Sequence, residues 1–109
     1  MAKTERDLYG TIELLVLKAL SWGPAHGFGI ARWVELVSDD ALHVEEGSLY
    51  PALYRLERRG WIAAEWGTSE LGKRIKVYSL TSAGRAQLRR EVAAWGDFTA
   101  AVAKVLGTA

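Results

Sequence analysis

The hydrophobic positions of the chain divide it into three helical segments, a pair of strands and a long final helix. From Ile12 to Leu20, seven of nine residues are apolar, and only Glu13 and Lys18 interrupt the run. A helix that is apolar nearly all round is buried on more than one side. We therefore expect this first helix to pack within its own domain and also against a partner.

A second helix is predicted over about Gly27–Val37, because apolar residues recur there at three- and four-residue spacing: Ile30, Trp33, Val34 and Val37. The segment SWGPAHG before it is predicted to be a turn, since Gly23-Pro24 ends a helix. The segment SDDALHVEEG after it is an acidic connection.

The stretch EEGSLYPALYRLERRGW predicts a third helix that directs Leu49, Leu53 and Leu56 to the core. With Gly47 or Ser48 near its cap, Pro51 falls in the first turn, where a missing N–H costs little. Gly60 is placed to end the helix in a left-handed conformation.

Two strand-like segments, WIAAEW and RIKVYSL, flank the polar loop GTSELGK, which we expect to be a loose, exposed hairpin tip. Thr81 or Ser82 then begins a helix that reaches about Leu106. This order predicts a mainly α fold with a small β-hairpin. It is a winged helix-turn-helix over residues 8–80, followed by one C-terminal dimerisation helix over residues 81–107.

Composition narrows the class of protein. The chain has 109 residues and no cysteine, which fits one domain in the cytoplasm. The charged N-terminus MAKTERDLYG lacks the apolar core of a signal peptide, and the apolar run LLVL is too short to span a membrane. Two histidines without metal-ligand spacing and the lack of a glycine-rich phosphate loop argue against an enzyme, a metal site or a cofactor.

Charge is distributed unevenly although the net charge is only +1. Residues 32–46 carry one base against five acids, whereas residues 47–76 carry six bases against three acids. A basic segment inside a neutral chain is a local footprint of nucleic-acid binding.

The third helix of a winged helix-turn-helix enters the major groove of DNA, and its outer face is therefore the candidate DNA-binding surface. Hydroxyl and guanidinium groups on or beside that face suit phosphates and base edges: Ser48, Tyr50, Pro51, Tyr54, Arg55 and Arg58. The alternative is that the tyrosines pack on the hairpin and the arginines are solvated charges.

The hairpin tip adds three bases, Lys73, Arg74 and Lys76. A basic tip after a candidate recognition helix can contact a phosphate strand or a minor groove. Alone, such a run is usually a solvated turn.

Together, EEGSLYPALYRLERRGWI, YSLTSAGR and HGFGIA resemble the PadR family of transcriptional regulators, over about Leu8 to Leu106. The resemblance implies a homodimer that binds operator DNA, represses transcription and in many cases is released by a small aromatic or drug-like molecule. The short C-terminal segment is similar to the subgroup in which a single helix forms the dimer. Phe28 departs from the tyrosine of many members, so it lacks a hydroxyl for phosphate.

Along the last helix, five apolar residues and Thr99 step by four and three and form a heptad-like seam: Leu88, Val92, Trp95, Thr99, Val102 and Leu106, widened by Phe98 and Val105. We expect this seam to form the dimer interface. The alternative is that the helix folds back on its own domain.

By resemblance, Trp95 matches a tryptophan that lines a ligand cavity between subunits, with Phe98 and Leu15 as further candidates. An indole face stacks planar aromatics. Plain interface packing by Trp95 remains the alternative. A winged helix used for protein contact without ligand sensing is the alternative function, and the sequence leaves open the operator, the effector and repression versus activation.

Overall fold

Three helices enclose the core of the protein. The structure, a computed structural model, describes residues 2–108 and the side chains of residues 11–108. Helix α1 spans Ala2–Leu20, α2 spans Gly27–Val37 and α3 spans Glu46–Arg58. The second helix agrees with the sequence prediction, whereas the third begins at Glu46, before the predicted cap at Gly47 or Ser48. The first begins ten residues earlier than Ile12, because polar residues continue a helix beyond the apolar stripe that marks it.

The core forms where α1, α2 and α3 meet the base of the hairpin. Side chains that are fully or almost fully buried include Leu17 and Leu20 of α1, Ile30 of α2, and Leu49, Leu53 and Leu56 of α3. The three leucines of α3 therefore face inward, as their spacing predicts. Gly60 follows α3 with φ of 77°, the left-handed conformation expected at that position.

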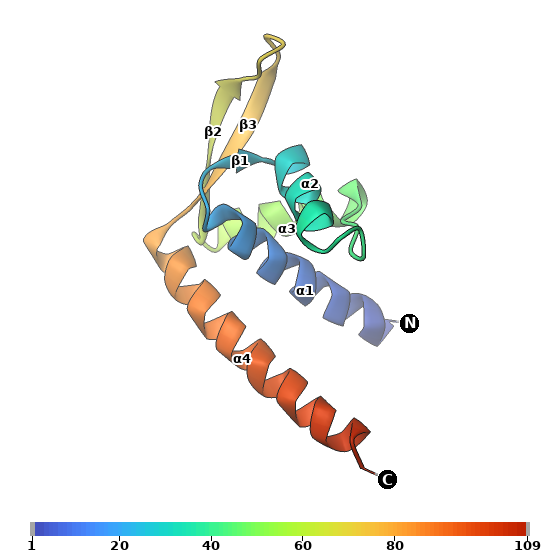
Figure 1. The fold of residues 1–109 in the computed structure, drawn as a ribbon. Coiled ribbons are helices and arrows are strands. Elements are labelled where there is room, and N and C mark those ends of the chain that lie inside the picture. Colours follow the sequence, from blue (N-terminus) through green and yellow to red (C-terminus); the bar gives the residue numbers. More distant parts are fainter. Residues whose placement is uncertain (1, 109) are drawn as a thin grey trace.

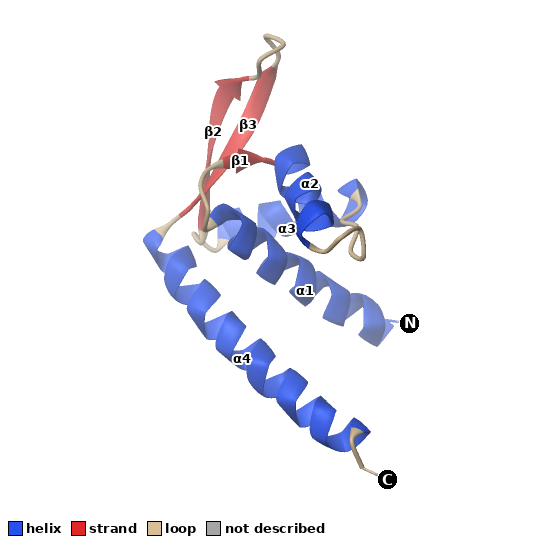
Figure 2. Ribbon diagram, in the orientation of Figure 1, coloured by secondary structure: helices blue, strands red, loops and turns tan. Residues whose placement is uncertain are grey.

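A small antiparallel sheet projects from the helices (Figures 1 and 2). Strands β2, Ile62–Thr68, and β3, Arg74–Leu80, form the predicted hairpin, called the wing below. A two-residue strand, β1, Ala25–His26, pairs with β3, so the strand order is β1-β3-β2. The segment before α2 was predicted to be only a turn, and this prediction was incomplete.

Helix α4, Ser82–Leu106, begins at Thr81, whose hydroxyl accepts a hydrogen bond from the N–H of Gly84 at 3.0 Å. Its first turns lie against the helical body, and its C-terminal half extends away from it (Figure 1). The winged helix-turn-helix with one additional helix agrees with the predicted fold class. No helix in the described part of the chain has the length and hydropathy needed to cross a lipid bilayer.

Candidate nucleic-acid interface

Helix α3 presents its polar residues on the side opposite its buried leucines. Tyr54 is 61% exposed, Pro51 and Arg58 are exposed, and Ser48 is half-buried. The guanidinium of Arg58 lies 5.7 Å from the centroid of the Tyr54 ring, one helical turn away. An aromatic hydroxyl and a guanidinium thus form one exposed group on the C-terminal half of α3, while the guanidinium keeps its N–H donors available.

Tyr50 is only partly available, at 47% exposure. Its hydroxyl lies so close to α2 that a Cβ on Gly27 would be 2.7 Å from it. Tyr50 therefore packs one edge on the start of α2 and offers the other edge to solvent.

The predicted position of Pro51 in the first helical turn is wrong. The cap is Glu45, so α3 starts at Glu46 and Pro51 is its sixth residue. Proline lacks the N–H that would bond to the carbonyl of Gly47, four residues earlier. The side chain itself lies on the exposed face, as expected.

Arg55 occupies a different place from the one predicted on or beside the outer face. Its Nε donates to Glu13 Oε2 of α1 at 2.6 Å, and Arg59 Nη1 donates to Glu13 Oε1 at 3.1 Å. The Glu13 side chain is only 11% exposed. A carboxylate this buried requires charged partners, and this requirement draws Arg55 toward α1.

The tip of the wing is a hydrogen-bonded turn, so the expectation of a loose loop is wrong. Ser69 and Lys73 exchange backbone and side-chain hydrogen bonds, with Ser69 N donating to Lys73 O at 2.7 Å and Lys73 N donating to Ser69 Oγ at 3.1 Å. Lys73 and Arg74 are exposed there. Lys76 lies nearer the body, and its Nζ is 3.5 Å from Glu57 Oε1 of α3.

The wing, α3 and the start of α2 together line one concave space of about 730 Å³. Its walls include Phe28 of α2, Tyr50 of α3, and Lys73, Arg74 and Lys76 of the wing. The structure thereby brings the N-terminal half of α3 and the basic wing, predicted separately, to one surface.

The sequence analysis gave no role to two exposed aromatic residues of this surface, Trp66 and Phe28. Trp66 of β2 is 59% exposed, and its ring centroid lies 4.4 Å from the guanidinium carbon of Arg74. Phe28 is 70% exposed and stacks on His26, with 6.3 Å between ring centroids. His26 caps α2 by accepting a hydrogen bond from the N–H of Gly29 at 3.0 Å.

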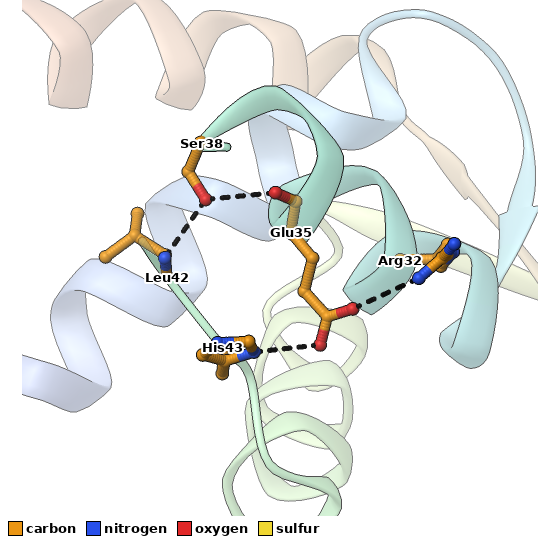
Figure 3. A network of polar contacts seen from close by, with 5 residues as sticks. All are labelled: Arg32, Glu35, Ser38, Leu42 and His43. Atoms are coloured by element: carbon orange, nitrogen blue, oxygen red, sulfur yellow. Dashed lines mark hydrogen bonds and ion pairs between the residues drawn. The ribbon is translucent and has the colours of Figure 1, made fainter. Parts of the chain in front are cut away.

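The connection between α2 and α3 is held by a network centred on Glu35 (Figure 3). Glu35 contacts His43 Nδ1 at 3.2 Å and Arg32 Nη1 at 3.7 Å. The hydroxyl of Ser38 donates to the Glu35 carbonyl and accepts from the N–H of Leu42. The hydrogen bond to Glu35 raises the pKa of His43 above its ordinary 6.5. This network fixes the segment that leads into α3.

Burial in the core raises the pKa of Tyr78 above its ordinary 10.0, so this phenol stays neutral at the base of the wing, where β3 joins the core. Among the described side chains, no group of three or more His, Asp or Glu residues is arranged to hold a metal ion.

The candidate dimer and ligand residues occupy different surroundings. Along α4, Val92, Trp95, Phe98, Val102 and Leu106 are exposed by 38% or more, whereas Leu88 packs on the core of its own chain. Thr99 is also exposed. The rings of Trp95 and Phe98 lie 5.8 Å apart at a tilt of 40°.

Leu15 is half-buried and lines a separate groove of about 430 Å³ between α1 and α2. The groove is also lined by Trp22, Trp33 and Val37. Within one chain, two of the ligand candidates, Trp95 and Phe98, therefore lie on α4, and the third, Leu15, lies in this groove.

The fold and this surface define a class, the winged helix-turn-helix DNA-binding regulators. Residues 16–90 match the model of the transcriptional regulator PadR-like family. The chain belongs to this family and is accordingly a DNA-binding transcriptional regulator rather than an enzyme.

Proteins similar to this chain include transcriptional regulators of known structure. A PadR family transcriptional regulator from Eggerthella lenta is 32% identical, with a TM-score of 0.78 over 99% of this chain and 93% of its own. A transcriptional regulator from Clostridium thermocellum is 26% identical, with a TM-score of 0.80 over 87% of this chain and 92% of its own. An uncharacterized 37.1 kDa protein in a transposon of Streptomyces fradiae is 42% identical over 72% of this chain, but the match spans only 21% of that protein.

Proposed function

We propose that the protein is a homodimeric repressor that binds a pseudo-palindromic operator through α3 and the wing. The observation that carries the proposal is the shared concave surface, which joins Tyr50 of α3 to Lys73 and Arg74 of the wing. A duplex placed there would meet hydroxyl groups in its major groove and cations at its backbone. The exposed Tyr54 and Arg58 extend this surface along α3.

In this proposal, residues 8–80 form the DNA-binding domain and residues 81–107 form the dimerisation helix. The side chains of residues 8–10 lie outside the described part of the structure. Two copies of α3 would lie roughly 34 Å apart, one turn of DNA, when α4 joins the two chains.

The DNA-binding residues divide by their surroundings. Pro51, Tyr54, Arg58, Lys73 and Arg74 have the exposure needed for direct contact, whereas Ser48 is half-buried and Tyr50 retains one exposed edge. Lys76 and Arg55 are paired with Glu57 and Glu13, respectively, so we assign them to support of the surface.

A gel-shift titration against the promoter region upstream of the gene tests the proposal. We expect binding that weakens steeply with salt, because Lys and Arg displace counterions from phosphates. Arg58→Ala and Lys73→Ala should each weaken binding, while Lys104→Ala, an exposed change on α4, should not. Salt-insensitive binding, or none, would instead favour a module for protein contact without ligand sensing.

We also propose that a small aromatic or drug-like effector binds beside Trp95 and Phe98 and releases the DNA. The exposed, adjacent rings support this role because an indole face stacks planar molecules. Leu15 lines the separate groove between α1 and α2, and in this proposal a second chain brings it to the pocket. Calorimetric titration with proflavine, a planar aromatic cation, should show binding to the native protein and weaker binding to Trp95→Ala. Equal binding would leave Trp95 as interface packing.

A further inference from the structure

We propose that Trp66 is a positioning residue that holds the Arg74 guanidinium for contact with the DNA backbone. The inference rests on the proposed DNA binding and adds a residue that no motif identifies. The key observation is the 4.4 Å separation between the guanidinium carbon of Arg74 and the centroid of the Trp66 ring.

The register of the wing explains why these two side chains meet. Trp66 pairs directly with Lys76, and Arg74 lies two residues before Lys76 in β3, nearer the tip and on the same face. Diagonal neighbours across an antiparallel pair are within reach when one is aromatic and the other is long. Lys76, the direct neighbour of Trp66, forms an ion pair with Glu57. The cation that lies over the Trp66 ring is therefore Arg74.

This face of the wing points toward the helices. Ile62 and Tyr78, which lie on it nearer the body, are buried in the core. Beyond the core the same face carries Trp66 and Arg74 over the concave space lined by Tyr50 and Phe28. The stacked pair therefore lies inside the proposed DNA-binding surface, not on the back of the wing.

Stacking suits arginine for this role. A guanidinium that lies on an indole face keeps its N–H donors at its rim, so it can stack and still bind a phosphate in bidentate fashion. A free arginine must lose side-chain freedom when it binds. Trp66 removes part of that cost by ordering Arg74 in advance, although Trp66 is itself 59% exposed and contributes little to the core.

A double-mutant cycle on DNA affinity tests the proposal. The probe is a labelled mixed-sequence duplex, because phosphate contacts do not require the operator. Trp66→Leu should weaken binding about two- to five-fold, the range that an exposed cation–π contact supports. Trp66→Phe should restore much of the loss. In an Arg74→Ala background, Trp66→Leu should have no further effect.

The control is Leu71→Ala, which removes another exposed apolar side chain at the wing tip and should bind like the native protein. Thermal unfolding of each variant shows whether the wing is retained. If Trp66→Leu weakens binding equally with and without Arg74, or not at all, the positioning role is wrong. If the native protein binds no duplex, the proposed function fails and this inference with it.

Discussion

At the scale of single residues, Glu13 links two helices that are distant in sequence. It is the buried acid among the described residues of α1, and it receives hydrogen bonds from Arg55 of α3 and from Arg59, which directly follows α3. These contacts connect α1, which was predicted to pack also against a partner, to α3, which is proposed to bind DNA. Removing the Glu13 carboxylate leaves two guanidinium groups without a counter-charge in a partly buried site.

We expect Glu13→Gln to lower the free energy of unfolding by about 1–3 kcal/mol, because hydrogen bonds to charged groups are lost in a site of low exposure. Urea denaturation followed by circular dichroism measures the change. The control is Glu57→Gln, whose side chain is 37% exposed and faces Lys76; its cost should stay below about 0.5 kcal/mol. Equal losses in the two variants would contradict a special role for Glu13.

The residues that were predicted correctly differ in kind from those that were not. Leu49, Leu53 and Leu56 were placed in the core because helical spacing is a local signal. Arg55 was misplaced because its partner lies 42 residues away, and no local pattern carries that contact. Trp66 was overlooked for the same reason, since its neighbours depend on the register of the wing.

At the scale of elements, the first turn of α4 makes a very close contact with the body. A Cβ on Gly84 would lie 1.9 Å from the carbonyl oxygen of Trp61. That carbonyl also accepts a hydrogen bond from the N–H of Thr81 at 3.1 Å, and the Thr81 hydroxyl donates to the Gly60 carbonyl at 2.7 Å. The segment that follows α3 and the start of α4 are thus joined by hydrogen bonds to two backbone carbonyls.

Gly84→Ala should lower stability by about 1–3 kcal/mol, because a backbone carbonyl cannot move aside as a side chain can. Thermal unfolding measures this. Gly47→Ala is the matched control, since a Cβ there meets no atom within 4 Å, and it should raise stability by up to about 1 kcal/mol. A neutral Gly84→Ala would mean that α4 is not held where the structure places it.

The connection between α2 and α3 should respond to pH. The hydrogen bond to Glu35 raises the folded pKa of His43, so the protonated ring is favoured in the folded state. Its contribution is fully present below 6.5, the ordinary pKa of histidine, and is lost as pH rises through the higher folded pKa. We expect His43→Asn to destabilise the protein more at about pH 6 than at about pH 8.

Thermal unfolding of native protein and His43→Asn at both pH values measures that difference. The Glu35→Gln background is the control, because without the carboxylate only the smaller effect of Asp40 still raises the pKa, and the pH dependence of the substitution should shrink. If the stability difference between native protein and His43→Asn were the same at both pH values, protonation of the ring would contribute nothing to its contact with Glu35. Since His43 is exposed, the effect should be small.

Strand β1 shows the limit of prediction for elements. Helices α2 and α3, the hairpin and the start of α4 follow from spacing, turn residues and caps. Ala25–His26 is too short to display a period, and it becomes a strand only by pairing with Tyr78 and Val77 of β3. Its existence is a property of the assembled fold.

At the scale of the whole molecule, α4 is the element whose apolar residues are left exposed. The molecule measures 58 × 28 × 26 Å, and its C-terminal half-helix leaves the body with its apolar stripe uncovered. A stripe of this kind in one chain is an exposed hydrophobic patch, which marks an interaction site. A seam with heptad-like spacing is best covered by the same seam of a second copy.

We therefore expect the native protein to elute with twice the chain mass of 12.0 kDa in size-exclusion chromatography with light scattering. Val102→Glu should shift it to the monomer, because the charge would be buried between the two stripes. Ala100→Glu places the same charge on another side of α4, at an exposed position, and should remain dimeric. Since a monomer presents one recognition helix where the proposed pseudo-palindromic operator requires two, Val102→Glu should also lose most of its DNA affinity while keeping its helical content. A Val102→Glu protein that stays dimeric would place the interface elsewhere and leave the exposed stripe of α4 without its proposed partner.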